Sequence, residues 1–333
     1  MSPRLMKREH AHRRLLLLGL STLLLLSILP TLGHHLFNDF EAPLGNIEHV
    51  GAFCAAALRI LLTPVHGAFH IALAVGFSYG VWDRIAAGLS LRNVLTSLET
   101  QAPADGSPLA LAAYRAGLKR EVVCVVAGLP NPAFTAGMWS ARIFVRSNLQ
   151  WQLTQDELDC VIAHEASHAK RRDPLRLSIY RFLSCLLFWM PALKGLAADM
   201  ADEAEIEADT IAGKDRPFAL ASAILHLAAQ PQVISPSRPL VRFHNPDLLD
   251  RRIRRLTGED TSLPTRLSRR SLSFASLAVV LVLSSGLAAA QPSSLGHSAA
   301  DNHCKHHHGS LWSHLWCSPR DCHGASGHCE HSG

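Results

Sequence analysis

One short stretch of the chain has residue types and spacing that suit a bound metal ion. Residues 161–172 read VIAHEASHAKRR and contain His164, Glu165 and His168. Residues four apart lie on one face of a helix, so both imidazoles can reach one ion. Glu165 lies next to them and is placed to take a proton from the attacking water. The pattern predicts a zinc-binding helix with Glu165 as general base.

The residues before this motif predict a well-started helix. Thr154 followed by Glu157 forms a capping box, and apolar residues then recur at helical spacing. A chance match is the alternative in a chain with 20 histidines. Many of those histidines lie in the last part of the chain, so they do little to raise the probability of a chance match at residues 164–168.

A catalytic zinc site needs a third protein ligand, and an acidic stretch downstream offers one. Residues 198–213 read ADMADEAEIEADTIAG, in which Glu205 and Asp209 are four apart. Such a helix can supply one ligand and one carboxylate that orients a ligand histidine. The alternative is a solvated surface helix.

The two motifs together resemble the membrane-embedded gluzincin peptidases. His164-Glu165-x-x-His168 followed by Glu205-x-x-x-Asp209 is similar both to the BlaR/MecR-type antirepressor peptidases and to the CAAX-protease/HtpX-type peptidases. The resemblance covers roughly residues 90–260. It implies that His164, His168 and Glu205 bind zinc, that Glu165 is the general base, and that Asp209 supports a ligand.

The order of the flanking segments resembles the BlaR/MecR type more closely. Asp173, an aromatic apolar run and the acidic helix follow in that order, and residues 244–256 resemble the closing helix of both families. The segment FTAGMWSARIFV takes the place of a strand in the BlaR/MecR type but lacks the proline common there. That strand is therefore matched loosely.

Long apolar runs place the chain in a membrane. The chain is 48% hydrophobic with a mean hydropathy of +0.13. Apolar runs at about 14–32, 50–82 and 271–290 predict three crossings. Basic residues flank these runs so that the N-terminus and the central region lie inside and the tail outside. A signal peptide is the alternative for the first run.

A fourth apolar run, 177–196, is not expected to cross. His168 and Glu205 must reach one ion, so they lie on the same side of the membrane. The run between them is too short to cross twice. We therefore predict a buried or interfacial helix there.

The predicted fold class is a mainly α membrane protein with an α+β, gluzincin-like zinc peptidase domain. Residues 1–89 form the N-terminal transmembrane region, 90–265 the peptidase domain, 271–290 the C-terminal transmembrane helix and 291–333 a disordered tail. Within the peptidase domain, a helix is predicted over 109–121 and strands over 122–128 and 141–147, with a Gly/Pro/Asn-rich loop between the strands. Four cysteines outside the tail are expected to be reduced packing residues: Cys54, Cys124, Cys160 and Cys185.

The tail is rich in cysteine and histidine and has few aliphatic residues for a core. Such tracts bind zinc, copper or nickel, whereas the alternative is a disordered tail with one or two disulfides. The candidate metal ligands of the tail are His303, Cys304, His306, His307, His308, Cys317, Cys322, His323, His328 and Cys329.

These features predict an integral-membrane zinc metalloendopeptidase with a regulatory or signal-transducing role. Its expected partners are the lipid bilayer and a protein substrate, and the resemblance implies that this substrate is a transcriptional repressor. Direct nucleic-acid binding is not expected, because the basic residues 251–255 are interpreted as a solvated helix face. Two alternatives stay open: a CAAX-protease/HtpX-type quality-control protease and a non-enzymatic membrane metal-binding protein.

Overall fold

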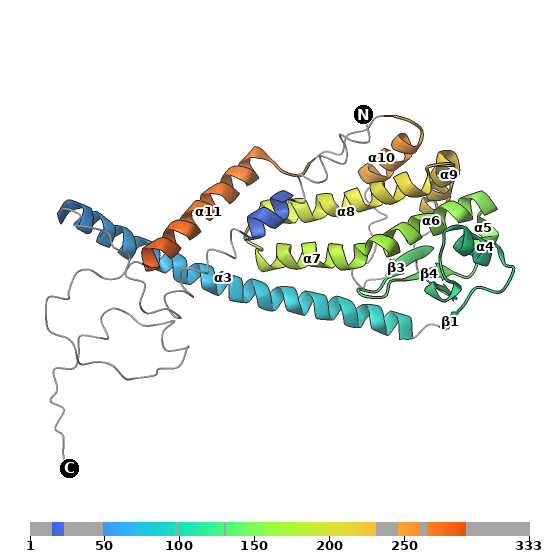
Figure 1. Ribbon diagram of the computed structural model, residues 1–333, viewed down its shortest axis with the longest axis horizontal. Coiled ribbons are helices and arrows are strands. Elements are labelled where there is room, and N and C mark those ends of the chain that lie inside the picture. The colour runs from blue at the N-terminus through green and yellow to red at the C-terminus, as the bar shows by residue number, and fades with distance from the viewer. Residues whose placement is uncertain are drawn as a thin grey trace, which may run out of the picture. The chain divides into compact units, whose positions relative to one another are not determined.

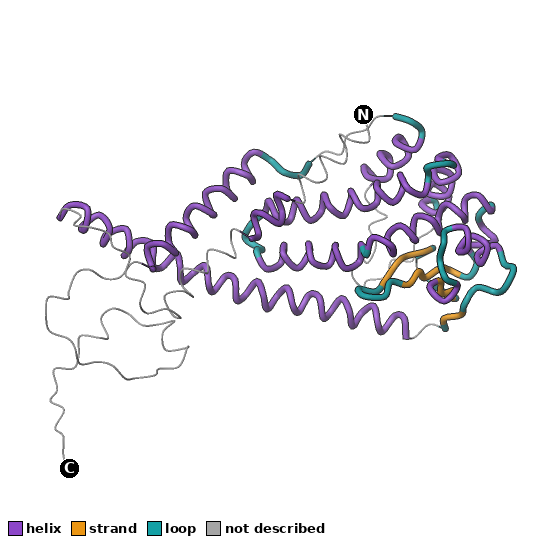
Figure 2. Tube along the Cα trace, viewed as in Figure 1, coloured by secondary structure: helices purple, strands orange, loops and turns teal. Residues whose placement is uncertain are grey.

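The structure is a computed structural model that describes residues 15–22, 49–96, 99–129, 131–230, 246–259 and 265–290. All of these belong to one compact unit, residues 1–290. Helices make up most of the described chain, and the strands gather in one small mixed sheet (Figure 2). The tail and its predicted metal ligands lie outside the described residues.

The longest element is α3, His49–Thr96, which continues as one helix through Pro64 (Figure 1). Within the described residues, one helix is long and apolar enough to cross a membrane, and it covers Ile60–Thr96. Many of its large apolar side chains are exposed, including Ile60 and Leu61, as lipid contact would require. The second predicted crossing, 50–82, lies within α3.

The other two predicted crossings are described to different extents. Residues 15–22 are helical, but the rest of the predicted span 14–32 lies outside the described residues. The C-terminal span forms helix α11, Arg269–Ala290, which packs on α3. The three-crossing topology itself stays a prediction.

The predicted single helix over 177–196 is wrong, because the chain turns within it. Helix α7, Asp173–Leu186, ends there, and α8, Pro191–Ala212, begins with a proline in its first turn. Proline suits that position because its missing N–H needs no partner there. The turn is partly buried, because Leu187 and Met190 are fully buried whereas Phe188 is 52% exposed.

The sheet has the order β1-β2-β4-β3. Its strands are β1 Thr100–Gln101, β2 Val123–Val126, β3 Ala133–Ala136 and β4 Arg142–Arg146. Strands β2 and β4 are parallel, and β3 pairs antiparallel with β4. The two predicted strands are confirmed as β2 and β4, whereas β3 lies in what was expected to be a loop.

The remaining elements surround the sheet and the motif helix. They are α4 Pro108–Arg115, the 3-10 turn Arg120–Val122, α5 Leu149–Gln152, α6 Gln155–Arg171, α9 Pro217–Ala228 and α10 Pro246–Leu256. Helix α4 is shorter than predicted, because Gly117 with a φ of 67° breaks the helical path. A core of apolar residues joins α4, β2, β4, α6 and α9.

Two ion pairs with buried carboxylates connect the long apolar helices to α7 and α8. Asp83 of α3 is 3.0 Å from Arg181 of α7 and also pairs with Arg84. Asp199 of α8 is 3.1 Å from Arg266, which precedes α11. Both carboxylates are almost fully buried, whereas the side chains of Arg181 and Arg266 are 53% and 37% exposed.

Three of the predicted packing cysteines are described, and all are buried and unpaired: Cys124, Cys160 and Cys185. The side chain of Cys54 lies outside the described residues.

Candidate metal centre

The motif helix α6 begins as the sequence predicts. The Thr154 hydroxyl accepts from the Glu157 N–H, and the Glu157 carboxylate accepts from the Thr154 N–H at 2.9 Å. This capping box satisfies two backbone donors that would otherwise be unpaired. Further along α6, the side chains of His164, Glu165 and His168 are all buried.

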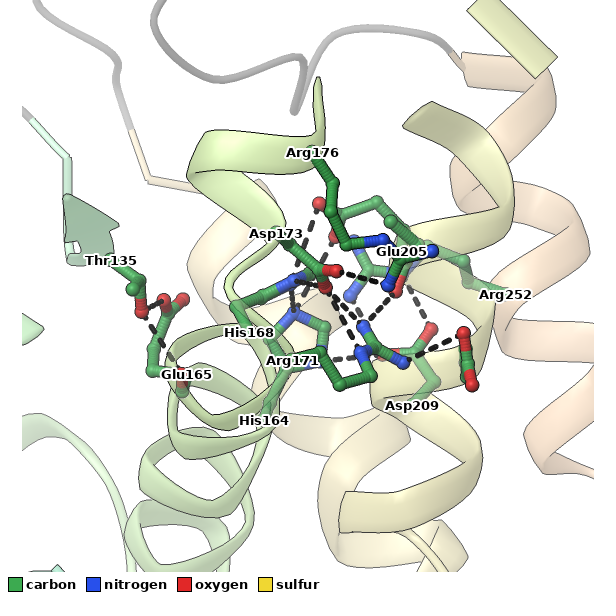
Figure 3. A network of polar contacts seen from close by, with 12 residues as sticks. Thr135, His164, Glu165, His168, Arg171, Asp173, Arg176, Glu205, Asp209 and Arg252 are labelled. Carbon is green, nitrogen blue, oxygen red and sulfur yellow. Dashed lines mark hydrogen bonds and ion pairs between the residues drawn. The ribbon is translucent and has the colours of Figure 1, made fainter. Parts of the chain in front are cut away.

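Three potential ligand side chains converge between α6 and α8. The Nε2 atoms of His164 and His168 lie 3.2 Å apart. Glu205 of α8 brings Oε2 to 3.4 Å from the Nε2 of His164 and Oε1 to 3.7 Å from the Nε2 of His168. The structure therefore brings together the three predicted zinc ligands (Figure 3).

The spacing of these atoms fits a tetrahedral zinc ion. With Zn–N bonds of about 2.0–2.1 Å, two ligand nitrogens of a tetrahedral site are about 3.3 Å apart. The 3.2 Å between the two imidazole nitrogens is close to this value, and one ligand atom from each of the three residues lies within 4.8 Å of the others.

Each histidine has a carboxylate against its other ring nitrogen. His164 Nδ1 lies 3.0 Å from Asp209 Oδ1, and His168 Nδ1 lies 2.8 Å from Asp173 Oδ2. A carboxylate there keeps the proton on Nδ1 and leaves the Nε2 lone pair for a metal. The predicted position of Asp209 agrees with this geometry, and Asp173 is an additional partner.

Asp173 is itself held by two arginines. Arg171 donates to its Oδ2 through Nε at 3.0 Å, and Arg176 donates to its Oδ1 at 2.9 Å. Burial on its own raises the pKa of Asp173, but the contacts with His168 and Arg171 lower it below its ordinary value. Asp173 is therefore a fixed anion behind His168.

Arg252 of α10 contacts two carboxylates of α8 at the site. Its guanidinium donates to both carboxylate oxygens of Asp209 and lies 3.3 Å from Glu205. The side chain is only 5% exposed, so the prediction that residues 251–255 form a solvated helix face is wrong for this arginine. Burial alone raises the pKa of Asp209, but Arg252 and His164 lower it overall.

The charge of His164 depends on the same carboxylates. Burial on its own lowers the pKa of the imidazole, but Asp209 and Glu205 raise it to about 9 when no ion is bound. A proton on Nε2 therefore competes with a cation for the same position. Metal binding releases such a proton, as expected for a histidine ligand.

Glu165 lies on the other side of α6 from Glu205, next to strand β3 (Figure 3). Its carboxylate accepts a hydrogen bond of 2.7 Å from the Thr135 hydroxyl. A narrow pocket adjoins Glu165 and His164, and it is lined mainly by apolar side chains of β3, α6 and α9. The site thus combines a candidate metal-ligand set, a buried carboxylate and an apolar pocket.

Three residues of the site were not predicted to act there: Thr135, Asp173 and Arg252. Arg252 had a usable signal, because it lies four residues from both Leu248 and Leu256 on the apolar face of α10. Asp173 lies in the expected order after His168, but no helical spacing connects them. Thr135 is brought to Glu165 by the tertiary fold alone.

A buried His-Glu-x-x-His motif, with a carboxylate from a neighbouring helix as third potential ligand, is typical of the class of metal-dependent hydrolases. The family described as BlaR1 peptidase M56 matches residues 64–256, which is more than half of the chain. The chain belongs to this family, as the resemblance of its motifs predicts.

Curated relatives come from a neighbouring group of proteases. A protease HtpX homolog of Pyrococcus furiosus is 35% identical over 119 residues, which are 35% of this chain and 41% of the relative. Protease HtpX homolog 2 of Methanosarcina acetivorans is 35% identical over 81 residues, or 20% of this chain and 28% of the relative. A protease HtpX homolog of Janthinobacterium sp. is 38% identical over 69 residues, or 20% and 23%. The chain spans less than half the length of each of these relatives.

Proposed function

We propose that this chain is an integral-membrane zinc metalloendopeptidase with a regulatory role. The observation that carries the proposal is the convergence of His164, His168 and Glu205, whose potential ligand atoms lie within 4.8 Å of one another, with Glu165 lining the same pocket as His164. Family membership supports the same activity. A metal-binding scaffold would need the three ligands but would have no use for a buried carboxylate base.

The residues divide the chemistry between them. Zinc, when held by His164, His168 and Glu205, supplies a Lewis acid for the scissile carbonyl and makes the attacking water more acidic. Glu165 takes the proton from that water and returns it to the leaving amine. Asp173 and Asp209 hold the two imidazoles in the tautomer that keeps Nε2 free.

Strand β3 and the apolar pocket indicate how a peptide would bind. Strand β3 is at the edge of the described sheet, so an extended peptide can add to it by backbone hydrogen bonds. The pocket beside Glu165 is narrow, and Leu220, Ile224 and Leu227 of α9 give it an apolar wall. Both features support an endopeptidase that takes extended or unfolded segments.

Zinc content and proteolysis test the proposal together. The full chain in detergent or membranes is compared with a Glu165→Gln variant on an unfolded protein substrate. We expect one zinc ion in the core of each form and cleavage only by the wild type. Zinc bound without cleavage by either form would favour the metal-binding alternative, and a core without zinc would refute the proposal.

A signalling role is proposed rather than quality control because the relatives of the BlaR/MecR type transmit an outside signal to an inside protease. In this arrangement the peptidase domain is cytoplasmic, the tail lies outside, and a transcriptional repressor is the substrate. Accessibility labelling of single cysteines introduced at residues 105 and 310 tests the topology. If both cysteines are labelled from the same side of the membrane, the single predicted crossing between them, 271–290, is refuted.

The Cys/His-rich tail is proposed as the part that senses metal or redox state. Deletion of 301–333 tests this role, with cleavage measured in cells under zinc, copper or nickel stress. We expect cleavage of the substrate to lose its dependence on the metal. Unchanged regulation would instead favour an HtpX-type housekeeping protease, whose activity does not need the tail.

A further inference from the structure

Strand β3 presents alternate side chains to two different neighbours. Ala133 belongs to the core that also contains α6, whereas Phe134 and Ala136 belong to a cluster on the other face of the sheet. Because side chains alternate along a strand, Thr135 points to the same face as Ala133. The register of β3 therefore directs the Thr135 hydroxyl toward the motif helix.

The Thr135 hydroxyl touches Glu165 at two points. Its Oγ1 is 2.7 Å from the carboxylate Oε2 and 3.0 Å from the backbone carbonyl oxygen of Glu165. The hydroxyl has one proton, and a bond of 2.7 Å to a carboxylate is typical of a charge-assisted hydrogen bond. The proton is therefore donated mainly to Oε2.

Threonine is suited to holding a carboxylate in one orientation. Its branched β-carbon restricts χ1, and the strand fixes its backbone, so the hydroxyl has little freedom to move. Glu165 is itself only 6% exposed, so solvent competes weakly for Oε2. The hydrogen bond thus joins two side chains that each have few other conformations or hydrogen-bond partners.

We propose that Thr135 is a positioning residue for the general base. By donating to Oε2, Thr135 fixes the plane of the carboxylate and leaves Oε1 to accept the proton of the attacking water. This role rests on the proposed peptidase function, because it assigns Glu165 the task of a base. Thr135 touches neither the metal ligands nor the carboxylates behind them.

Kinetics of two variants test the role. Thr135→Val keeps the shape and branching of the side chain but removes the donor, whereas Thr135→Ser keeps the donor. A hydrogen bond to a charged group contributes on the order of 1.5–3 kcal/mol, so we expect kcat to fall about tenfold or more in the valine variant. We expect KM and zinc content to stay near wild type and serine to restore most of kcat.

The matched control is Thr100→Val in β1, the opposite edge of the same sheet, where the side chain is exposed. This control makes the same replacement in the same sheet and should keep wild-type kinetics. An unchanged or raised kcat in Thr135→Val would overturn the proposal. A serine variant as impaired as the valine variant would also overturn it.

A binding experiment decides the role of Thr135 even without turnover. A peptide hydroxamate binds catalytic zinc and gives its hydroxyl proton to the base, and its affinity for the zinc-loaded protein is measured by calorimetry. We expect Thr135→Val to weaken binding about tenfold when Glu165 is present and to have no further effect in a Glu165→Gln background. Equal losses in both backgrounds would overturn the positioning role. Tight hydroxamate binding without peptide cleavage would count against the peptidase proposal alone.

Discussion

The guanidinium of Arg252 holds both carboxylate oxygens of Asp209, through Nε at 2.7 Å and Nη2 at 2.8 Å. Asp209 in turn lies 3.0 Å from His164 Nδ1. A residue of α10 therefore contacts a predicted metal ligand of α6 through a carboxylate of α8. The ion pair links helices that are distant in sequence.

Removal of Arg252 is expected to destabilise the protein strongly. In an Arg252→Met variant the carboxylate of Asp209 stays buried without its partner, and breaking a buried pair costs about 3–5 kcal/mol. The thermal unfolding temperature in detergent measures the effect. The control is Arg254→Gln, because Arg254 is exposed on the same helix and pairs with exposed Asp250. We expect that control to leave the unfolding temperature almost unchanged, and equal effects of the two variants would contradict the account.

Asp173 is expected to tune metal affinity through His168. An Asp173→Asn variant loses the carboxylate that fixes the His168 tautomer, so zinc affinity should fall about 10- to 100-fold. Competition with a chelator at fixed pH measures this affinity. Asp156→Asn is the control, because Asp156 is exposed at the start of α6 and pairs with Arg216. An unaltered zinc affinity in Asp173→Asn would show that Asp173 is only structural.

Gly76 marks the closest approach of α3 to the end of α7. A Cβ there would overlap the carbonyl oxygen of Leu186, whereas a Cβ at Gly67 would meet nothing within 4 Å. We expect Gly76→Ala to destabilise the protein by about 1–3 kcal/mol because the two helices must separate. Gly67→Ala should be neutral or slightly stabilising, since alanine favours helix more than glycine. Thermal unfolding of both variants distinguishes this packing effect from helix propensity.

Glu157 gives a prediction for the dependence of stability on pH. Burial alone raises the pKa of Glu157, but donors from Ser222 and Thr154 lower it overall in the folded state. A carboxyl with a lowered folded pKa stabilises the protein above its unfolded pKa of about 4.3 and loses that contribution as pH falls through the folded value. Glu157→Gln should therefore destabilise at pH 7, and its difference from wild type should shrink toward pH 3. Thermal unfolding across this range checks the trend, with exposed Glu99→Gln as the control.

The local features of the site were predictable from the sequence. The capping box at Thr154 and the helix that carries His164 and His168 follow from helical spacing, whereas the choice of Glu205 as third ligand came from the resemblance to the gluzincin peptidases. These features depend on residues within a few turns of one another or on the strict geometry of a metal site. The prediction of strands β2 and β4 succeeded for a related reason, because buried strands have continuous apolar runs.

Other features of the fold and the site depend on tertiary contacts and were not predicted from the sequence. Strand β3 has Ala and Thr where a loop was expected, and its pairing with β4 is what makes it a strand. The turn between α7 and α8 did have a signal in the sequence, because Pro191 is favoured in the first turn of a helix and disfavoured inside one. Arg252 was taken for a solvated residue because its neighbours are also arginines, although its spacing from Leu248 places it on the buried face.

The position of strand β3 has a consequence for insertions and deletions. One face of the strand directs Thr135 to Glu165, and the cluster on its other face packs on Leu91 and Leu95 of α3. One residue added just before Thr135 would reverse every later side chain of the strand, since a shift of one exchanges the two faces. The hydroxyl would then point toward α3. Length changes between β3 and β4 leave the facing of the strand intact, so natural variation in length should concentrate in that turn and avoid the four residues of β3.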